Sequence, residues 1–318
     1  MSAAEGLWLA PLRGVTIRTF RTVFGEAIRA AGFVGMYAPF IPANAGFRFS
    51  TRLFADILPA KSDESEKFEF DSASTQQQSN TQTLKHSNKT ARGLVLVPQV
   101  IGKDPAALRD WCRAVKDLGY TRADLNAGCP FPMIRRKGRG SGLLRTPDTL
   151  DRMLEAGCDE MGAGNFSLKT RLGLDRPDEL LGLMPIINRY PLAVLTVHAR
   201  TARQMYDGAT DRVAFEAVAA AAAVPVMYNG DAAVDGVRPD GAVMVGRSFI
   251  RSLARRADAR ELLAHYLEAS RRELCGDAPV LGRMKELLSY WCQEPVWRRL
   301  WPAVKICRTV GELTLCCR

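Results

Sequence analysis

A cysteine lies beside a dense cluster of basic residues in the segment 123–145, whose sequence is ADLNAGCPFPMIRRKGRGSGLLR. Five bases with no acid among them follow the cysteine: Arg135, Arg136, Lys137, Arg139 and Arg145. A thiol can act as a nucleophile or a general acid, and bases at this density suit an anionic polymer. The alternative is a buried structural cysteine, Cys129, next to a solvated loop. The segment by itself supports both interpretations about equally.

The composition favours a polyanionic partner. The chain has 318 residues, is 47% hydrophobic and carries a formal net charge of +10. Such a charge points to nucleic acid first, although by itself it does not separate RNA from DNA or from a membrane surface. No apolar run reaches the length of a membrane span, and the N-terminus lacks the basic start of a signal peptide. We therefore expect a cytoplasmic protein that does not enter a membrane.

The eight cysteines give no sign of a metal centre. They form no C-x-x-C pair and show no zinc-type spacing with histidine. In a reducing compartment they are expected to be thiols. We therefore predict that the protein needs no metal.

Short apolar, β-rich segments alternate with helix-forming segments over most of the chain. The eight expected strands are 7–12, 33–40, 94–100, 123–129, 166–171, 195–200, 224–230 and 241–246, with helical segments such as 105–118, 147–156 and 212–223 between them. This alternation predicts an α/β fold, a (β/α)8 TIM barrel over residues 1–250. A doubly wound open sheet is the alternative, but no G-x-G-x-x-G motif follows the first strand.

Three regions depart from this rhythm. Residues 61–92 include an uncharged, polar stretch with almost nothing to bury and are predicted to be a disordered insertion. The segment between Asp231 and Gly246 is too short for a full helix. Residues 251–318 hold 13 Lys or Arg against 8 Asp or Glu and predict a small helical domain, whose tryptophans we expect to be core anchors.

Polar residues and glycines follow nearly all the expected strands, at the end where barrel enzymes carry their active sites. They are Arg13 and Gly14, which follow Pro11 and Leu12; Gln99; Asn126 and Cys129; Lys169 and Arg171; His198, Arg200 and Arg203; Asn229, Gly230 and Asp231; Gly246 and Arg247. Singly, each has an ordinary structural explanation. Together they describe a flavin mononucleotide (FMN) site, with a phosphate at the last two loops and Lys169 beside a ring that gains negative charge on reduction.

These motifs resemble the tRNA-dihydrouridine synthase family. The matching stretches are LAPLRGVTIRTFR, VPQVIGKDP, DLNAGCPFPMIRRKGRGSGLL, SLKTRLG, TVHARTARQMYDG, VMYNGD, DGAVMVGR and LGRMKELLSYW. The resemblance runs from about Leu7 to Lys285 and leaves out residues 61–92. N-x-G-C-P followed by K-G-x-G-S, H-x-R-T-x-x-Q and N-G-D is a specific combination.

The resemblance implies an enzyme that reduces a specific uridine of tRNA to 5,6-dihydrouridine. NADPH or NADH would reduce bound FMN, the flavin would pass hydride to C6, and Cys129 would give a proton to C5. It implies cofactor contacts from Pro11, Leu12, Arg13, Gln99, Lys169, His198, Asn229, Gly230, Asp231, Gly246 and Arg247. It implies substrate or tRNA contacts from Asn126, Arg135, Arg136, Lys137, Arg139, Arg171, Arg200, Arg203, Arg283 and Lys285, with residues 251–318 as a tRNA-binding domain.

Two other functions remain open from the sequence. One is an FMN-dependent barrel oxidoreductase that acts on a small pyrimidine-like molecule, and the other is a non-catalytic tRNA-binding relative. Arg13 stands where the family often has a small residue, so it either touches the flavin or blocks part of the site. We expect a monomer.

Overall fold

The computed structural model describes residues 6–58, 93–231 and 241–317. The predicted disordered insertion at 61–92 and most of the short segment between Asp231 and Gly246 lie outside these ranges. Nothing in the structure therefore bears on those two predictions.

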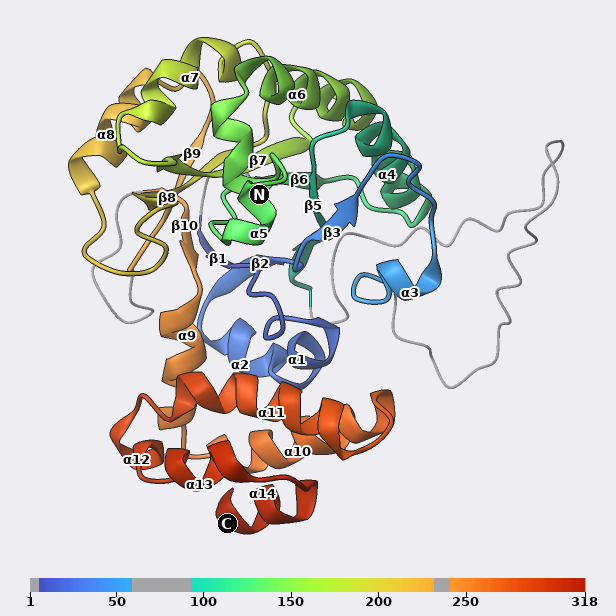
Figure 1. Ribbon diagram of the computed structural model, residues 1–318, viewed down its shortest axis with the longest axis vertical. Coiled ribbons are helices and arrows are strands. Elements are labelled where there is room, and N and C mark those ends of the chain that lie inside the picture. The colour runs from blue at the N-terminus through green and yellow to red at the C-terminus, as the bar shows by residue number, and fades with distance from the viewer. Residues whose placement is uncertain (1–5, 59–92, 232–240, 318) are drawn as a thin grey trace, which may run out of the picture.

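The described residues contain one sheet of ten strands in which every pairing is parallel (Figure 1). In chain order the strands are β1 (Leu7–Leu9), β2 (Phe33–Tyr37), β3 (Ile41–Ala43), β4 (Val95–Val97), β5 (Gln99–Gly102), β6 (Ala123–Ala127), β7 (Phe166–Gly173), β8 (Leu195–Thr201), β9 (Val226–Asn229) and β10 (Val243–Val245). Their order in the sheet is β3-β5-β6-β7-β8-β9-β10-β1-β2-β4.

The sheet closes into a barrel at Pro98. β4 pairs with β2, β5 pairs with β6, and Pro98 alone separates β4 from β5. Proline has no N–H for a strand ladder, but its carbonyl still accepts a hydrogen bond of 3.0 Å from the backbone N–H of Asp124. The ring thus has eight positions, and the predicted α/β barrel is confirmed, with its third strand in two pieces.

Helices and short helical turns follow the strands along the chain. They are α1 (Arg18–Val23), α2 (Gly25–Ala30), α3 (Thr51–Phe54), α4 (Pro105–Asp117), α5 (Pro132–Arg135), η1 (Gly140–Arg145), α6 (Pro147–Met161), α7 (Glu179–Ile187), α8 (Arg212–Ala221), α9 (Arg247–Ser252) and η2 (Leu253–Arg255). Two long helices begin at an aspartate whose carboxylate accepts backbone N–H groups, Asp104 for α4 and Asp211 for α8. β3 is a short strand that the sequence did not suggest.

Five further helices gather on the side of the barrel formed by α1 and α9 (Figure 1). They are α10 (Ala259–Glu273), α11 (Asp277–Trp291), α12 (Pro295–Arg298), α13 (Trp301–Ile306) and α14 (Val310–Cys317). Trp291 and Trp297 are buried, as expected for core anchors, and Trp301 is half-buried. None of the described helices is long and apolar enough to cross a membrane.

An aromatic cluster joins these helices to the barrel. The ring centroid of Phe24 lies 4.4 Å from that of Phe20, 5.6 Å from that of Tyr266 and 6.2 Å from that of Trp291. Phe20 and Phe24 come from the first helices after β1, whereas Tyr266 and Trp291 come from α10 and α11. All four belong to one hydrophobic core that continues through the barrel. The division into two domains at residue 250 therefore remains a prediction.

Candidate active site at the barrel mouth

Three side chains form a hydrogen-bonded chain that leads to the cysteine. Gln99 donates from Nε2 to Oδ2 of Asp124 at 2.7 Å, and its Oε1 accepts from Nδ2 of Asn126 at 2.8 Å. The Oδ1 atom of Asn126 then accepts the backbone N–H groups of Gly128, at 3.1 Å, and Cys129, at 2.9 Å. Gln99 and Asp124 are fully buried. The turn that carries the thiol is thus fixed from inside the barrel.

Cys129 is also held from the opposite side. Its carbonyl accepts the backbone N–H of Ser141 at 3.1 Å and the Ser141 hydroxyl at 2.9 Å. Gly140 has a φ of +55°, and a Cβ there would come 2.8 Å from the Cβ of Cys129. Burial raises the pKa of the Cys129 thiol, while a backbone hydrogen bond at Phe131 and nearby cations, Arg171 first among them, oppose that rise. The thiol is therefore protonated at neutral pH and available as an acid.

Lys169 lies one strand away. In the parallel register of β6 and β7 it is the partner of Asn126. Its Nζ donates to Oδ1 of Asn229 at 2.8 Å, and Nδ2 of Asn229 donates to the carbonyl of Met244 at 2.8 Å. Burial, together with the charge of Arg171, lowers the pKa of Lys169 to about 8. The ammonium still predominates at neutral pH, and it is a positive charge in a poorly solvated position.

Arg171 ties two loops together. Its guanidinium donates to the carbonyls of Gly128 at 2.9 Å, Thr201 at 2.8 Å and Met205 at 2.6 Å. It also lies over the ring of Tyr206, 5.3 Å from the centroid. Burial lowers the pKa of Arg171 to about 10, which leaves it charged at neutral pH. The loop after β6 and the loop after β8 are therefore held to each other.

Arg200 is buried and fully engaged. It donates to the carbonyl of Gly208 at 3.1 Å and to the carboxylate of Asp231 at 3.1 Å. It also lies 3.3 Å from Nε2 of His198. Because a guanidinium has no acceptor, Nε2 must accept and the imidazole is neutral. Burial and the surrounding cations lower the pKa of His198 well below its ordinary value, which agrees with a neutral ring.

The last two strands are followed by glycines at which a Cβ would be crowded by neighbouring atoms. A Cβ on Gly230 would come 2.4 Å from the hydroxyl of Tyr228, and a Cβ on Gly246 would come 3.1 Å from the Cβ of Ala10. Arg247 opens α9, where it lies 4.6 Å over the ring of Tyr206 and 3.5 Å from a carboxylate oxygen of Asp231. A cation and open backbone groups thus stand together where a phosphate was predicted.

The loop after β1 completes the rim. The backbone N–H of Leu12 donates to the Thr16 hydroxyl at 2.8 Å, and the side chains of Pro11 and Leu12 are half-buried. Arg13 is exposed and lies over the ring of Phe40, 5.5 Å from the centroid. Its charge opposes the rise in the pKa of Cys129, so Arg13 lies on the side of the mouth that holds the thiol.

The structure does not gather all the predicted tRNA residues at the mouth. Arg283 pairs with Glu273 at 2.7 Å, and Lys285 donates to the carbonyls of Lys305, at 2.9 Å, and Cys307, at 2.7 Å. Both side chains thus hold the C-terminal helices together. Their contact with tRNA stays a prediction.

The remaining predicted tRNA residues lie on the surface. Arg203 is exposed and pairs with Asp175, with Nε 3.0 Å from its Oδ1. Arg136 and Lys137 are exposed, and Arg135 and Arg139 are half-buried. The Nε atom of Arg139 is buried without a hydrogen-bond partner in the described parts of the chain.

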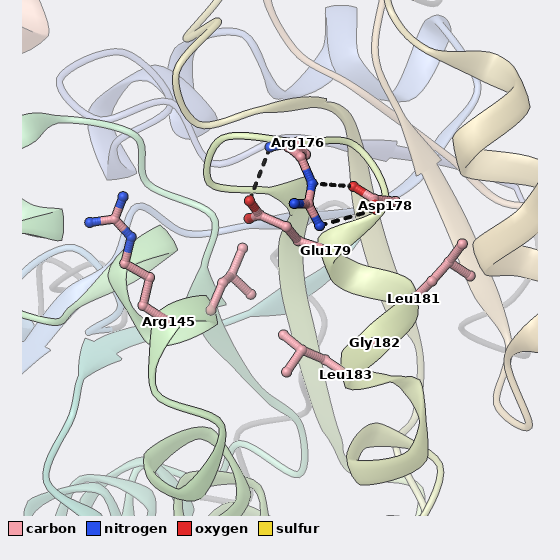
Figure 2. A pocket seen from close by; sticks show the side chains of 8 residues that line it. Arg145, Arg176, Asp178, Glu179, Leu181, Gly182 and Leu183 are labelled. Atoms are coloured by element: carbon pink, nitrogen blue, oxygen red, sulfur yellow. Dashed lines mark hydrogen bonds and ion pairs between the residues drawn. The ribbon is translucent and has the colours of Figure 1, made fainter.

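A separate depression of ≈ 650 Å³ lies between η1 and the start of α7 (Figure 2). It is lined by Leu144, Arg145, Arg176, Asp178, Glu179, Leu181, Gly182 and Leu183. On the α7 side of it, Arg176 pairs with Asp178, with Nε 3.0 Å from Oδ1. None of the predicted cofactor residues lines this depression, so we place the candidate site at the barrel mouth. In the described parts of the chain, no group of three or more His, Cys, Asp or Glu is arranged to hold a metal ion.

Two residues at the site were missed from the sequence. Asp124 anchors Gln99, and an acid in the middle of an apolar strand was an available signal. Tyr206 lies between Arg171 and Arg247, and its centroid is 6.2 Å from that of His198. No sequence signal set this tyrosine apart from the rest of its loop.

The fold and the mouth define a class: a parallel α/β barrel with a cationic, amide-rich mouth and a protonated thiol at the end of one strand. Residues 8–247 match the family model described as "Dihydrouridine synthase (Dus)". Since this match covers most of the chain, the protein belongs to the dihydrouridine synthase family.

Curated relatives agree with this assignment, and a solved structure shares the fold. A "Probable tRNA-dihydrouridine synthase" of Rhodobacter capsulatus is 36% identical over 144 residues, which are 44% of this chain and 43% of the relative. "tRNA-dihydrouridine synthase B" of Vibrio cholerae is 32% identical over 134 residues, 42% of this chain and 41% of the relative. The chain thus matches less than half of the length of these relatives. A morphinone reductase mutant in complex with tetrahydroNAD shares the fold, with a TM-score of 0.50 and 11% identity over 77% of this chain and 84% of that one.

Proposed function

We propose that the protein is a flavin-dependent tRNA-dihydrouridine synthase that uses NADPH or NADH to reduce a uridine of tRNA. The observation that carries the proposal is the placement of Cys129. Its backbone is fixed by Asn126, and Asn126 is opposite Lys169 in the β6–β7 register. A proton donor beyond the end of β6 and a buried cation on β7 are thereby held near each other, an arrangement that suits reduction of a uracil ring. The family match over residues 8–247 supports the same reaction.

The residues at the mouth fit FMN. The ring would find amide groups and the ammonium of Lys169, and the phosphate would find Arg247 with the backbone at Gly230 and Gly246. Both glycines stand where a Cβ would be crowded, so the backbone stays open there. Bound FMN would supply the hydride that adds to C6 of the uracil. Lys169 and Arg247 favour a bound group that carries negative charge.

Cys129 supplies the proton that C5 needs. Burial keeps its thiol protonated until the ring accepts the proton, and the charges of Arg171, Arg13 and Lys169 stabilise the thiolate that remains. Since Asn126 and Ser141 fix the turn on both sides, the thiol needs little rearrangement to reach its substrate. Arg13 therefore contributes to the site by its charge.

The RNA must bring an extruded base to this mouth. Leaving the stack costs a few kcal/mol, and phosphate contacts offset that cost. The bases from Arg135 to Arg139 lie six to ten residues beyond Cys129, on the loop that continues from the thiol. We assign them to the phosphates near the target nucleotide. Action as a monomer in the cytoplasm is part of the same proposal.

The test is an anaerobic reoxidation experiment. The FMN-loaded protein is reduced with NADPH, the visible flavin spectrum is followed, and unmodified tRNA or free uracil is added. Reoxidation with tRNA and not with uracil supports the proposal. Reoxidation with uracil alone would favour a reductase of small pyrimidines. A protein that binds tRNA but cannot be loaded with FMN would favour a non-catalytic relative.

A further inference from the structure

Two large apolar side chains stand in solvent immediately beyond the thiol. Phe131 is 48% exposed and Met133 is 72% exposed. They lie two and four residues after Cys129, at the start of α5, and we call them the α5 patch. Two residues span at most about 7 Å along the chain, so whatever covers Phe131 lies close to the thiol.

The backbone beneath the patch is firmly held. The carbonyl of Phe131 accepts the N–H groups of Ile134 at 2.9 Å and Arg135 at 3.0 Å, which closes the turn of α5. A Cβ on Gly142 would come 2.4 Å from the carbonyl of Arg135, so η1 packs directly against this turn. The exposure of Phe131 and Met133 therefore belongs to an ordered loop.

Positive charge follows the patch directly along the chain. Arg135, Arg136 and Lys137 follow Met133 within four residues, and none of them pairs with an acid in the described parts of the chain. The Phe131 ring likewise has no aromatic or cationic partner there. An unstacked nucleotide matches this surface, since it joins an apolar base face to a phosphate. A protein partner would have to bring acids as well as apolar groups.

Other exposed apolar residues show a different setting. Val213, 78% exposed, begins the outward helix α8, and Val296, Ile306 and Leu315 belong to the C-terminal helices. Among the described residues, only the α5 patch combines two such side chains with the nearby thiol and with basic side chains that pair with no acid. From this combination we propose that the α5 patch binds a nucleobase of the RNA next to the nucleotide being reduced. The inference rests on the proposed function. It adds a contact to a neighbouring nucleobase, distinct from the contacts to the target uracil and to the phosphates.

The test compares tRNA binding by the wild type and four variants at several salt concentrations. Phe131→Ala with Met133→Ala is expected to weaken binding about tenfold, with the slope of log Kd against log salt unchanged because no charge is removed. Val213→Ala, the matched control, is expected to bind like the wild type. Arg136→Ala is expected to lower the salt slope by about one. A Phe131→Trp variant should keep the affinity and show quenched tryptophan emission on tRNA binding.

The outcomes separate this inference from the proposed function. If the wild type binds and reduces tRNA while the double variant matches Val213→Ala, the patch has no role in RNA binding and the inference alone is wrong. If the wild type neither binds nor reduces tRNA, the inference and the proposed function are both wrong. Self-association of the wild type that the double variant abolishes, with tRNA affinity unchanged, would assign the patch to a second copy of the chain and overturn the inference.

Discussion

The barrel mouth and the loop beyond it use the same basic residue types in opposite ways. At the mouth, Arg171 and Arg200 are almost fully buried, and each donates to several carbonyl or carboxylate oxygens. On the loop, Arg136 and Lys137 are exposed and pair with no acid in the described parts of the chain. A buried cation needs fixed partners because desolvation is costly, whereas an exposed one keeps its water.

The two kinds of cation therefore have different roles: the buried ones position other groups, and the exposed ones attract a polyanion. The buried cations set the positions of loops and of the thiol, and salt screens them little. The exposed ones offer charge to a polyanion at a distance, and salt weakens them directly. Substitutions in the two regions should therefore change different measurements.

The largest expected effect is at the thiol. Cys129→Ala should lower dihydrouridine formation by about 10² to 10⁴-fold, the range for loss of a general acid, while FMN and tRNA binding are retained. Product formation is measured under single-turnover conditions. Cys158→Ala is the matched control, because Cys158 is equally buried and lies in α6, away from the mouth. Full activity of Cys129→Ala would remove this thiol from the chemistry.

Next in size is the buried guanidinium. Arg171→Met would leave the carbonyls of Gly128, Thr201 and Met205 without their donor, and we expect it to lower the free energy of unfolding by about 3 kcal/mol. Arg136→Met, the exposed counterpart, should stay within about 0.5 kcal/mol of the wild type. Urea unfolding measures both. Equal stabilities would mean that Arg171 does not hold the two loops together.

A smaller, pH-dependent effect is expected at Asp124. Burial raises the pKa of its carboxyl to about 7, above the ordinary value of about 3.9. The folded state therefore holds this proton more tightly than the unfolded chain. The stabilising contribution is complete below about pH 4 and is lost as pH rises to about 7, by at most about 1.4 kcal/mol per pH unit.

Asp124→Asn removes that titration and can still accept a hydrogen bond from Gln99. Its unfolding free energy minus that of the wild type should therefore increase between pH 5 and pH 7 and become constant above. Urea unfolding at pH 5, 6, 7 and 8 measures the difference. A difference that is flat across this range would show that Asp124 is ionised throughout it.

The smallest expected effect is on the loop. Lys137→Ala should leave the unfolding free energy within about 0.5 kcal/mol of the wild type and reduce the salt slope of tRNA binding by about one. Binding titrations between low and physiological salt measure the slope. An unchanged slope would mean that Lys137 meets no phosphate, and would weaken the contrast between the two regions.

Much of the fold could be predicted because strand and helix patterns are local. Each of the eight predicted strands overlaps an observed one, and the helix predicted over 105–118 begins at Pro105. The interruption of the third strand at Pro98 has a local cause, but the pairing of its two pieces does not. The two halves pair with different neighbours, and that depends on how the ring closes.

For the site, strand ends could be predicted and contacts could not. The rule that polar residues collect at one end of a barrel selected Asn126, Lys169 and Asn229, which the structure joins across three strands. Arg200 was expected to face substrate, but its acceptor Asp231 is 31 positions away in the sequence. Only the folded distance shows that this guanidinium is already engaged, and its role toward the RNA stays a prediction.

The aromatic cluster between α1 and the C-terminal helices decides how the two parts of the chain can face a large ligand. Phe24, which follows β1 closely, packs against Tyr266 and Trp291 without an intervening linker. This packing sets the position of the C-terminal helices relative to the barrel. An RNA that touched both would meet them at an angle set by three aromatic rings, and a change in their packing would tilt the whole RNA relative to the thiol.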